Sequence, residues 1–270
     1  MGKNSTIEWT DHTFNPWWGC TKVSQACKFC YAEAWAKRTG AKVWGPKADR
    51  RFFGEAHWRG PLRWDVEAAT SGQRPRVFCA SMADVFEYRA ELNPWREKLG
   101  DLIELTPNLD WLLLTKRPQR IRFTKRWSEW PGNVWLGTTV EDQDTAHERI
   151  PQLLENEAPV RFLSCEPLIG PLDIRNYLKA GVNWVIAGGE SGGKSRPAHP
   201  EWFASLRDQC LQAGVPFLFK QWGNWSPANP TVASPPNRVH IFPDGMAVVR
   251  RNKHDAGRLL AGRTWDEIPV

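Results

Sequence analysis

Short apolar runs alternate with segments of helical periodicity along most of the chain. This pattern predicts βα units joined into a mainly parallel sheet, which makes an α/β protein. Because such crossovers are right-handed, a series of six or seven units favours a partial or full TIM-type (β/α) barrel. The predicted strands are 13–17, 76–80, 111–115, 134–138, 161–164, 184–187 and 216–220, and the predicted helices are 31–38, 94–105, 119–127, 143–154, 174–179 and 200–213.

Two stretches interrupt this alternation. Residues 40–74, with several Trp, Lys and Arg side chains, look like an insertion after the first helix that covers the mouth of the barrel. Near the C-terminus, an irregular Pro-rich connection precedes a predicted hairpin over 239–249 and a short basic helix and cap over 255–267. We therefore expect a barrel domain over 1–224 and a C-terminal extension over 225–270.

The composition of the 270-residue chain indicates where the protein resides and what class of partner it binds. It has no run of about eighteen apolar residues and no signal-peptide core at its start, so we expect a cytoplasmic protein without a membrane partner. A net charge of +6 and seventeen tryptophans suit a polyanion, because Lys and Arg neutralise phosphates and aromatic rings stack on bases. The basic run 116–126 fits phosphate tracking or an ordinary solvated surface, and the tryptophans also suit a packed core.

Three of the six cysteines, Cys20, Cys27 and Cys30, lie in a loop between the first predicted strand and helix. In a cytoplasmic protein, such a group indicates a metal site rather than disulfides. Three thiolates can hold three corners of a cubane iron–sulfur cluster and leave the fourth iron open to a cofactor or substrate. The alternatives are a zinc site, with His12 or Cys79 as a distant fourth ligand, and a thioredoxin-like redox pair.

Polar residues stand at the C-terminal ends of the later strands. A barrel concentrates its chemistry at this edge, and a packed core would not need polar groups at so many equivalent places. The pattern therefore predicts a functional rim. Its candidate members are Ser81, Asp84, Thr115, Lys116, Arg117, Thr138, Thr139, Glu141, Ser164, Glu166, Gly188, Gly189, Glu190, Ser191, Lys220 and Gln221.

The spacing Cys-X6-Cys-X2-Cys resembles the cysteine motif of radical S-adenosylmethionine (SAM) enzymes, although their commonest form has three residues in the first gap. Phe29 fills the aromatic place before the last cysteine. Over nearly its full length the chain resembles an uncharacterised, phage-associated family of radical-SAM-like proteins, and in general layout it is similar to the spore photoproduct lyase branch, which repairs thymine lesions. The segments that carry the family resemblance, besides the cysteines, are Ile7-Glu-Trp-Thr-Asp11, Asn15-Pro16, Tyr31-Ala-Glu33, Ser81-Met-Ala-Asp84-Val-Phe86, Leu114-Thr-Lys-Arg-Pro118, Leu136-Gly-Thr-Thr-Val-Glu141, Ser164-Cys-Glu-Pro167, Gly188-Gly-Glu190-Ser-Gly192 and Phe219-Lys-Gln-Trp222.

This resemblance implies a radical SAM enzyme with a 4Fe-4S cluster on the three cysteines. Such a cluster binds SAM, and SAM cleavage yields a 5′-deoxyadenosyl radical that abstracts hydrogen from the substrate. A low-potential electron donor such as flavodoxin or ferredoxin is then required. The substrate expected from charge and aromatic content is a nucleic acid or nucleotide, for base modification or lesion repair with base flipping. A peptide or small metabolite, and a non-enzymatic nucleic-acid-binding module with a structural zinc or iron–sulfur site, remain alternatives.

The resemblance also suggests roles for the rim. In the superfamily, a Gly-Gly-Glu motif after the second strand receives the SAM amine, and Ser81 or Asp84 stands at that place here. The glycines 188 and 189 would let the backbone approach a ligand, with Glu190 on ribose or substrate. The expected cofactor-binding residues are Phe29, Ser81, Asp84, Thr138, Thr139, Ser164, Glu166, Gly188, Gly189 and Glu190, and the expected catalytic residues are Lys116, Glu141 and Glu190.

Overall fold

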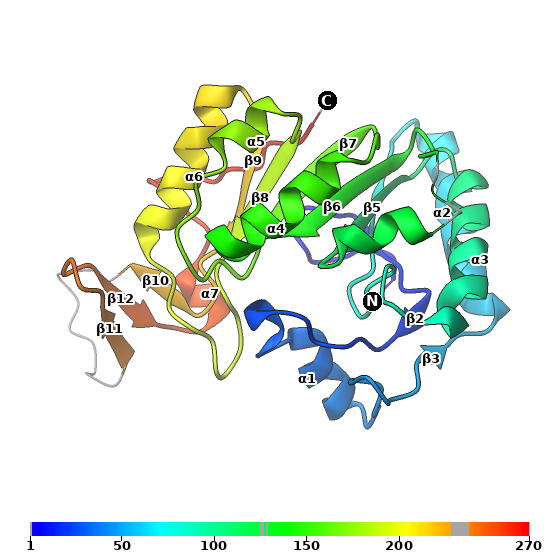
Figure 1. Ribbon diagram of the computed structural model, residues 1–270, viewed down its shortest axis with the longest axis horizontal. Helices are drawn as coiled ribbons and strands as arrows, with labels where there is room; N and C mark the ends of the chain where they lie inside the picture. Colours follow the sequence, from blue (N-terminus) through cyan, green and yellow to red (C-terminus); the bar gives the residue numbers. More distant parts are fainter. Residues whose placement is uncertain (1, 125–126, 128, 228–237, 270) are drawn as a thin grey trace.

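A single curved sheet of parallel strands organises the molecule (Figure 1). The computed structural model describes residues 2–124, 127, 129–227 and 238–269. The seven strands follow one another in the order β1-β4-β5-β6-β7-β8-β9, and they form a half-barrel, which confirms the predicted α/β partial barrel. The strands are β1 (His12–Thr13), β4 (Arg76–Cys79), β5 (Asp110–Thr115), β6 (Val134–Thr139), β7 (Val160–Cys165), β8 (Trp184–Gly188) and β9 (Phe217–Gln221).

Both faces of this sheet are buried, which explains why its strands are almost continuously apolar. Side chains alternate between the faces, so Val77 and Cys79 of β4 belong to the large outer core while Phe78 points to the concave side. The concave side holds a second apolar cluster, made of Trp9, Phe78, Leu112, Trp135, Phe162, Trp184, Ile186 and Leu218.

Helices cover the outer face of the sheet and complete the large core. Local signals set several of their ends: a capping box at Asp142 and Thr145 begins α4, and Gly214 ends α6 in the left-handed conformation. The covering helices are α2 (Glu55–Ser71), α3 (Asn93–Glu104), α4 (Gln143–Leu154), α5 (Arg175–Lys179) and α6 (Pro200–Ala213). The helix α1 (Tyr31–Arg38) lies apart from them, below the sheet in Figure 1, with the short strands β2 (Trp17–Trp18) and β3 (Arg51–Phe52).

Part of the segment expected to be an insertion is a helix of the barrel. Residues 55–71 form α2, and Trp58, Trp64 and Ala68 of this helix are buried in the outer core. This part therefore packs on the outer face rather than over the mouth, although Trp44 from the first part of the segment does line the cavity described below. The division of the chain at residue 224 stays a prediction.

Two other expected elements are wrong in detail. The first strand, expected over 13–17, is two short strands, because β1 pairs with β4 whereas β2 pairs antiparallel with β3 in a separate sheet. The helix expected over 119–127 is the 3-10 segment η3 (Pro118–Phe123), and positions 125 and 126 lie outside the described residues. The remaining 3-10 segments are η1 (Gln25–Cys27) and η2 (Ala90–Leu92).

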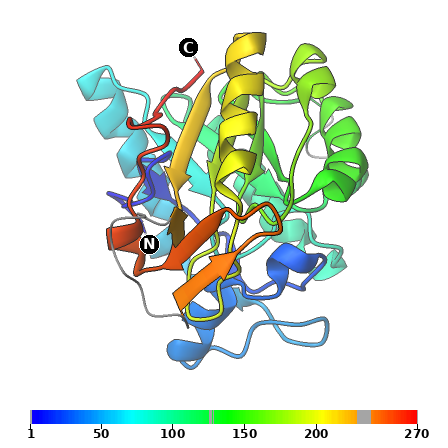
Figure 2. The same ribbon diagram turned by 90° about the vertical axis from the view of Figure 1, so that its left-hand side faces the viewer.

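The C-terminal region adds a small sheet and then returns to the barrel (Figure 2). The expected hairpin is formed by β11 (Val239–Ile241) and β12 (Ala247–Arg250), with β10 (Trp225–Pro227) on the other side of β12. The short basic helix expected within 255–267 lies earlier, because α7 spans Lys253–Ala256, and the rest of the range is not a helix: the Phe219 N–H donates to the Trp265 carbonyl at 2.9 Å. The chain end thus lies antiparallel along β9 and covers the edge of the sheet.

Within the described ranges, no helix is long and apolar enough to cross a membrane.

Candidate functional site

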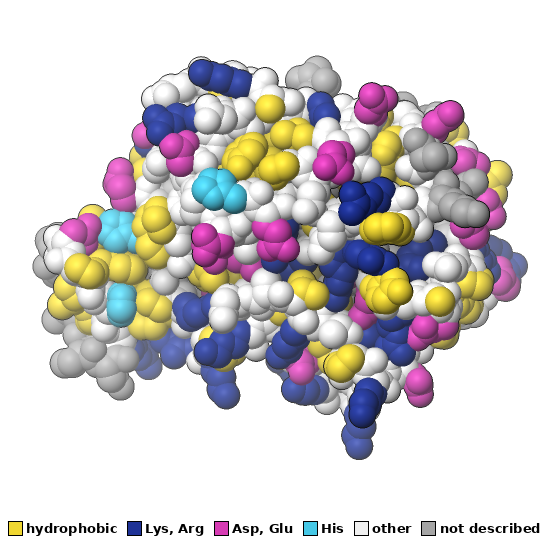
Figure 3. All heavy atoms as spheres, in the orientation of Figure 1, with side chains coloured by type: hydrophobic (Ala, Val, Ile, Leu, Met, Phe, Trp, Pro, Cys, Tyr) yellow, Lys and Arg dark blue, Asp and Glu magenta, His cyan; other side chains and the backbone are white. Residues whose placement is uncertain are grey.

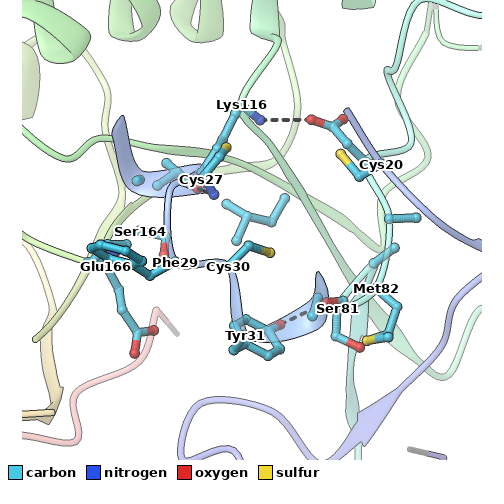
Figure 4. A pocket seen from close by; sticks show the side chains of 18 of the residues that line it. Cys20, Cys27, Phe29, Cys30, Tyr31, Ser81, Met82, Lys116, Ser164 and Glu166 are labelled. Carbon is cyan, nitrogen blue, oxygen red and sulfur yellow. Dashed lines mark hydrogen bonds between the residues drawn. The ribbon is translucent and has the colours of Figure 1, made fainter. Parts of the chain in front are cut away.

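A cavity of about 400 Å³ lies at the C-terminal ends of the strands, between the concave face of the half-barrel and the cysteine segment (Figure 4). Ile7, Trp9, Phe78 and Leu114 form an apolar part of its wall. Most of the predicted rim residues form the polar part. Among them are Ser81, Asp84, Lys116, Thr139, Ser164, Glu166, Gly189 and Glu190.

The three cysteines of the predicted metal site all line this cavity. Cys20, Cys27 and Cys30 are free and partly exposed thiols. In Figure 4 their sulfur atoms point into the cavity from different sides. Among the described residues, no three His, Cys, Asp or Glu side chains lie close enough together to hold one metal ion. The three thiols therefore surround the cavity and do not converge on the position of a single metal ion.

Backbone geometry and a buried ion pair hold the first cysteine in place. Gly19 has a φ of +117°, and a Cβ there would lie 2.3 Å from the Val43 carbonyl oxygen. The buried Arg50 guanidinium donates to the same Val43 oxygen at 3.0 Å and to the Thr21 hydroxyl at 3.1 Å. It also pairs with the Glu87 carboxylate at 2.7 and 2.9 Å and donates to the carbonyls of Ala48 and Gly45. The segment around Cys20 is thus bound to two other loops.

Arg117 joins the cysteine segment to the end of β5. Its guanidinium donates to the Asp84 carboxylate at 2.7 Å, to the Thr21 carbonyl at 2.6 Å and to Cys20 Sγ at 3.7 Å. Asp84 also accepts hydrogen bonds from the Thr115 hydroxyl and from two backbone N–H groups. Its carboxylate oxygens are therefore already used by the protein. Arg117, which the sequence placed both at the rim and in the basic run, lines the cavity.

The electrostatic surroundings shift the pKa values of Asp84, Cys20 and Cys27 differently. Burial favours the neutral form of Asp84, but Arg117 and the hydrogen bonds outweigh it and hold the pKa of Asp84 below its usual value. Burial raises the pKa of Cys20 to about 12, with a contribution from Asp84. Burial acts in the same direction on Cys27, yet Lys116 and the backbone N–H groups of Val23 and Ser24 lower the pKa of Cys27. Cys27 is thus the more readily ionised of these two thiols.

A second polar group lies where β7 and β9 end. Lys220 Nζ donates to both Glu166 oxygens at 2.8 and 2.7 Å. Gln221 Nε2 donates to Glu166 at 3.0 Å and to the Ser191 hydroxyl at 3.1 Å. Ser164 lines the cavity beside this group. The arrangement offers one compensated carboxylate and several neutral donors and acceptors, which suit hydroxyl and amine groups of a ligand.

The end of β8 meets the cavity through Glu190. The Glu190 carboxylate pairs with the Arg196 guanidinium at 2.6 Å, and that guanidinium also lies over the Phe29 ring, 5.5 Å from its centroid. A Cβ at Gly189 would lie 2.0 Å from the Trp222 carbonyl oxygen. Glycine is therefore required here by the close approach of two chain segments, independently of any ligand.

Three predicted site residues lie outside the cavity wall. Thr138 donates to the Thr115 carbonyl at 3.0 Å inside the sheet, and Gly188 packs against Glu166. Glu141 is fully buried, pairs with Arg149 at 2.8 Å and accepts from the Ala26 N–H of η1 at 3.4 Å. Glu141 thus contacts the cysteine segment through the Ala26 N–H and does not line the cavity.

The sequence did not single out several cavity residues. Trp9 and Lys253 come from widely separated parts of the chain, and no local pattern connects them with the cysteines, whereas Trp44 belongs to the segment that was expected to cover the mouth. Lys220 and Gln221, in contrast, follow a strand end and carried the same signal as the other rim residues.

Together these features define an α/β half-barrel protein with a cysteine-lined cavity at the C-terminal ends of its strands. The family model for the proteins of unknown function called DUF5131 matches residues 4–269, and the chain belongs to this family. Phage association stays a prediction. A search of curated protein sequences finds no significant match.

Among solved structures, the chain is similar to point mutants of spore photoproduct lyase. One of them matches with 11% identity and a TM-score of 0.48, over 93% of this chain and 71% of the lyase chain. Another, which contains a dinucleoside spore photoproduct, matches with 11% identity and a TM-score of 0.47, over 95% and 72% of the two chains.

Proposed function

We propose that this chain is a radical SAM enzyme that modifies or repairs a nucleic acid or nucleotide. The observation that carries the proposal is the position of Cys20, Cys27 and Cys30 around one cavity at the C-terminal ends of the strands. Barrels place their chemistry at this edge, and about 400 Å³ is within the range of small-molecule sites.

The arrangement of the thiols fits a cluster better than a zinc ion. A structural zinc ion needs four ligands about 2 Å from one point, and the described residues supply no such group. In a cubane, each cysteine binds a different iron, so the sulfurs stand apart around the cluster. Cys20, Cys27 and Cys30 would hold a 4Fe-4S cluster, which when bound would supply one-electron reduction of SAM, with a low-potential donor such as flavodoxin or ferredoxin as the source of the electron.

The protein's own side chains would hold and shield these groups. Arg117 fixes the backbone at Thr21 and contacts Cys20 Sγ, so it keeps the first cysteine directed at the cavity. The ammonium of Lys116 lies near Cys27 and favours its thiolate, the form that binds iron. The apolar wall of Ile7, Trp9 and Phe78 would exclude water from the reacting carbon.

The polar groups of the cavity suit the rest of SAM and the substrate. Ser164, Glu166 and Ser81 offer acceptors for the amine and ribose hydroxyls of SAM. Lys116 and Glu190 are the proposed catalytic side chains, because both line the cavity. The preference for a nucleic acid is supported by the net charge of +6.

Anaerobic reconstitution tests the proposal. We expect about four irons and four sulfides per chain, an EPR signal that SAM perturbs, and release of 5′-deoxyadenosine on reduction. Cys27→Ser should lose the cluster and SAM cleavage, whereas Cys210→Ala, which alters a buried thiol in the outer core, should retain both. One tightly bound zinc ion per chain without SAM cleavage would contradict the proposal.

A further inference from the structure

Two exposed aromatic rings and two arginines form a surface cluster that the cavity does not include. Arg120 lies over the Tyr88 ring at 4.0 Å and over the Phe123 ring at 4.7 Å from its guanidinium carbon. Arg122 lies over Phe123 at 5.0 Å. We call Tyr88, Arg120, Arg122 and Phe123 the arginine–aromatic surface. Figure 3 shows Lys and Arg side chains interspersed with hydrophobic ones over the η3 region.

The exposure of these rings is not explained by packing. Tyr88 is 78% exposed and Phe123 is 61% exposed, although most large aromatic side chains of this chain lie in its cores. Within the part of the chain that the structure describes, Arg120 and Arg122 have no carboxylate partner. The nearby acids Glu87 and Glu91 are already paired with Arg50 and Arg89. The surface therefore carries uncompensated positive charge beside exposed aromatic side chains.

The arginine–aromatic surface and the cavity wall are built on the same two chain segments. Tyr88 follows Asp84 by four residues on the loop after β4, and Arg120, in η3, follows Arg117 by three residues after the end of β5. Asp84 and Arg117 are paired with each other in the cavity wall. A ligand held on the arginine–aromatic surface would thus contact residues that stand three or four positions from residues of the cavity wall.

We propose that the arginine–aromatic surface binds unpaired nucleotides of a nucleic-acid strand. Arginine binds phosphates through its planar donors, and exposed aromatic rings stack on bases irrespective of sequence. An acidic protein would need the arginines but gains little from exposed aromatic side chains, so the exposure of Tyr88 and Phe123 favours bases. The inference rests on the proposed function for its substrate class and specifies which surface holds that substrate outside the cavity.

Fluorescence anisotropy with a labelled single-stranded oligonucleotide of about 16 nucleotides tests this surface. The cluster-loaded full chain would be titrated over a range of KCl concentrations. Tyr88→Ala and Phe123→Ala should each weaken binding roughly tenfold, the fold-change of one lost base–aromatic stack. Arg120→Gln should reduce the slope of log affinity against log salt by about one phosphate contact. Tyr88→Trp should preserve binding.

Matched controls remove an exposed apolar side chain or an exposed arginine elsewhere. Leu105→Ala, at a residue 66% exposed beyond the C-terminal end of α3, and Arg175→Gln at the start of α5 should leave affinity and salt slope unchanged. No oligonucleotide binding by the wild-type chain, or variants that bind like these controls, would overturn the inference. So would variants that lose reduction by flavodoxin but keep their oligonucleotide affinity, because the surface would then belong to a protein donor.

The same samples separate this inference from the proposed function. SAM cleavage in the absence of nucleic acid should be the same in Tyr88→Ala and in the wild type, since Tyr88 lies outside the cavity wall. Surface-dependent oligonucleotide binding by a chain that never cleaves SAM would support the surface and defeat the enzyme proposal. SAM cleavage by a chain that does not bind the oligonucleotide would support the enzyme proposal and overturn the inference about the surface.

Discussion

Gly19 is the residue whose backbone most directly constrains the cysteine segment. Its φ of +117° favours glycine, and any side chain would collide with the Val43 carbonyl oxygen at 2.3 Å. We predict that Gly19→Ala costs about 1–2 kcal/mol of folding free energy for the backbone conformation and about 1–3 kcal/mol more for the collision. Because Cys20 is the next residue, the reconstituted iron content should fall as well.

Gly45 provides a matched control, because it has the same φ of +117° but a Cβ there would meet no atom of the described residues within 4 Å. Gly45→Ala should therefore show only the conformational cost and should retain its iron. Chemical denaturation and iron analysis of the two variants measure the difference. Equal stability and equal iron content would refute the packing role of Gly19.

At the residue scale, the sequence predicted the cysteines but not their surroundings. Three thiols in eleven positions are a local pattern, and their shared cavity agrees with it. Arg117 follows a strand end, which predicts a rim position, but its contact with Cys20 spans ninety-seven positions of sequence and no local pattern predicts that contact. Glu141 has the same polar signal as Glu166, yet its partner Arg149 turns it away from the cavity. Such pairings follow from the packing of whole elements.

At the element scale, the strands and most helices were predictable because they combine apolar runs with local end signals. The helix α2 was missed because Gly60 and Pro61 interrupt it, and both residues locally favour a helix end. The burial of Trp58, Trp64 and Ala68 in the outer core outweighs this preference. The bridge between Asp266 and Leu218 was missed because β9, which holds Leu218, lies far away in the sequence.

The contact between α4 and η1 also belongs to this scale, and Glu141 mediates it. Its side chain is fully buried with that of Arg149, and its second oxygen accepts from the Ala26 N–H between two cysteines. Glu141→Gln leaves Arg149 without a buried counter-charge, so we predict a loss of about 3–5 kcal/mol in unfolding free energy together with a lower iron content. Thermal melting and iron analysis check this.

An exposed ion pair is the control for this prediction. Asp173 and Arg175 form a pair at the protein surface, so Asp173→Asn should change neither melting nor iron content appreciably. If Glu141→Gln instead keeps wild-type stability and iron but abolishes turnover, Glu141 acts on the substrate as the sequence pattern suggested, and its role as an anchor is wrong.

At the scale of the whole molecule, the chain end is part of the barrel core. Trp265 is 6% exposed, packs edge-on against Phe217 at 6.2 Å between ring centroids, and accepts a backbone hydrogen bond from Phe219. We predict that Trp265→Ala lowers the free energy of unfolding by about 3–5 kcal/mol. The temperature of a single cooperative melting transition should fall accordingly. Ile241→Ala, at a residue 65% exposed in the hairpin, should leave that transition unmoved. Calorimetry decides: if Trp265→Ala shifts only a separate minor transition, residues 225–270 form an independent unit, as the sequence pattern predicted. A shift of the whole transition means instead that Lys253 is held at the cavity by the same cooperative core that holds the cysteines.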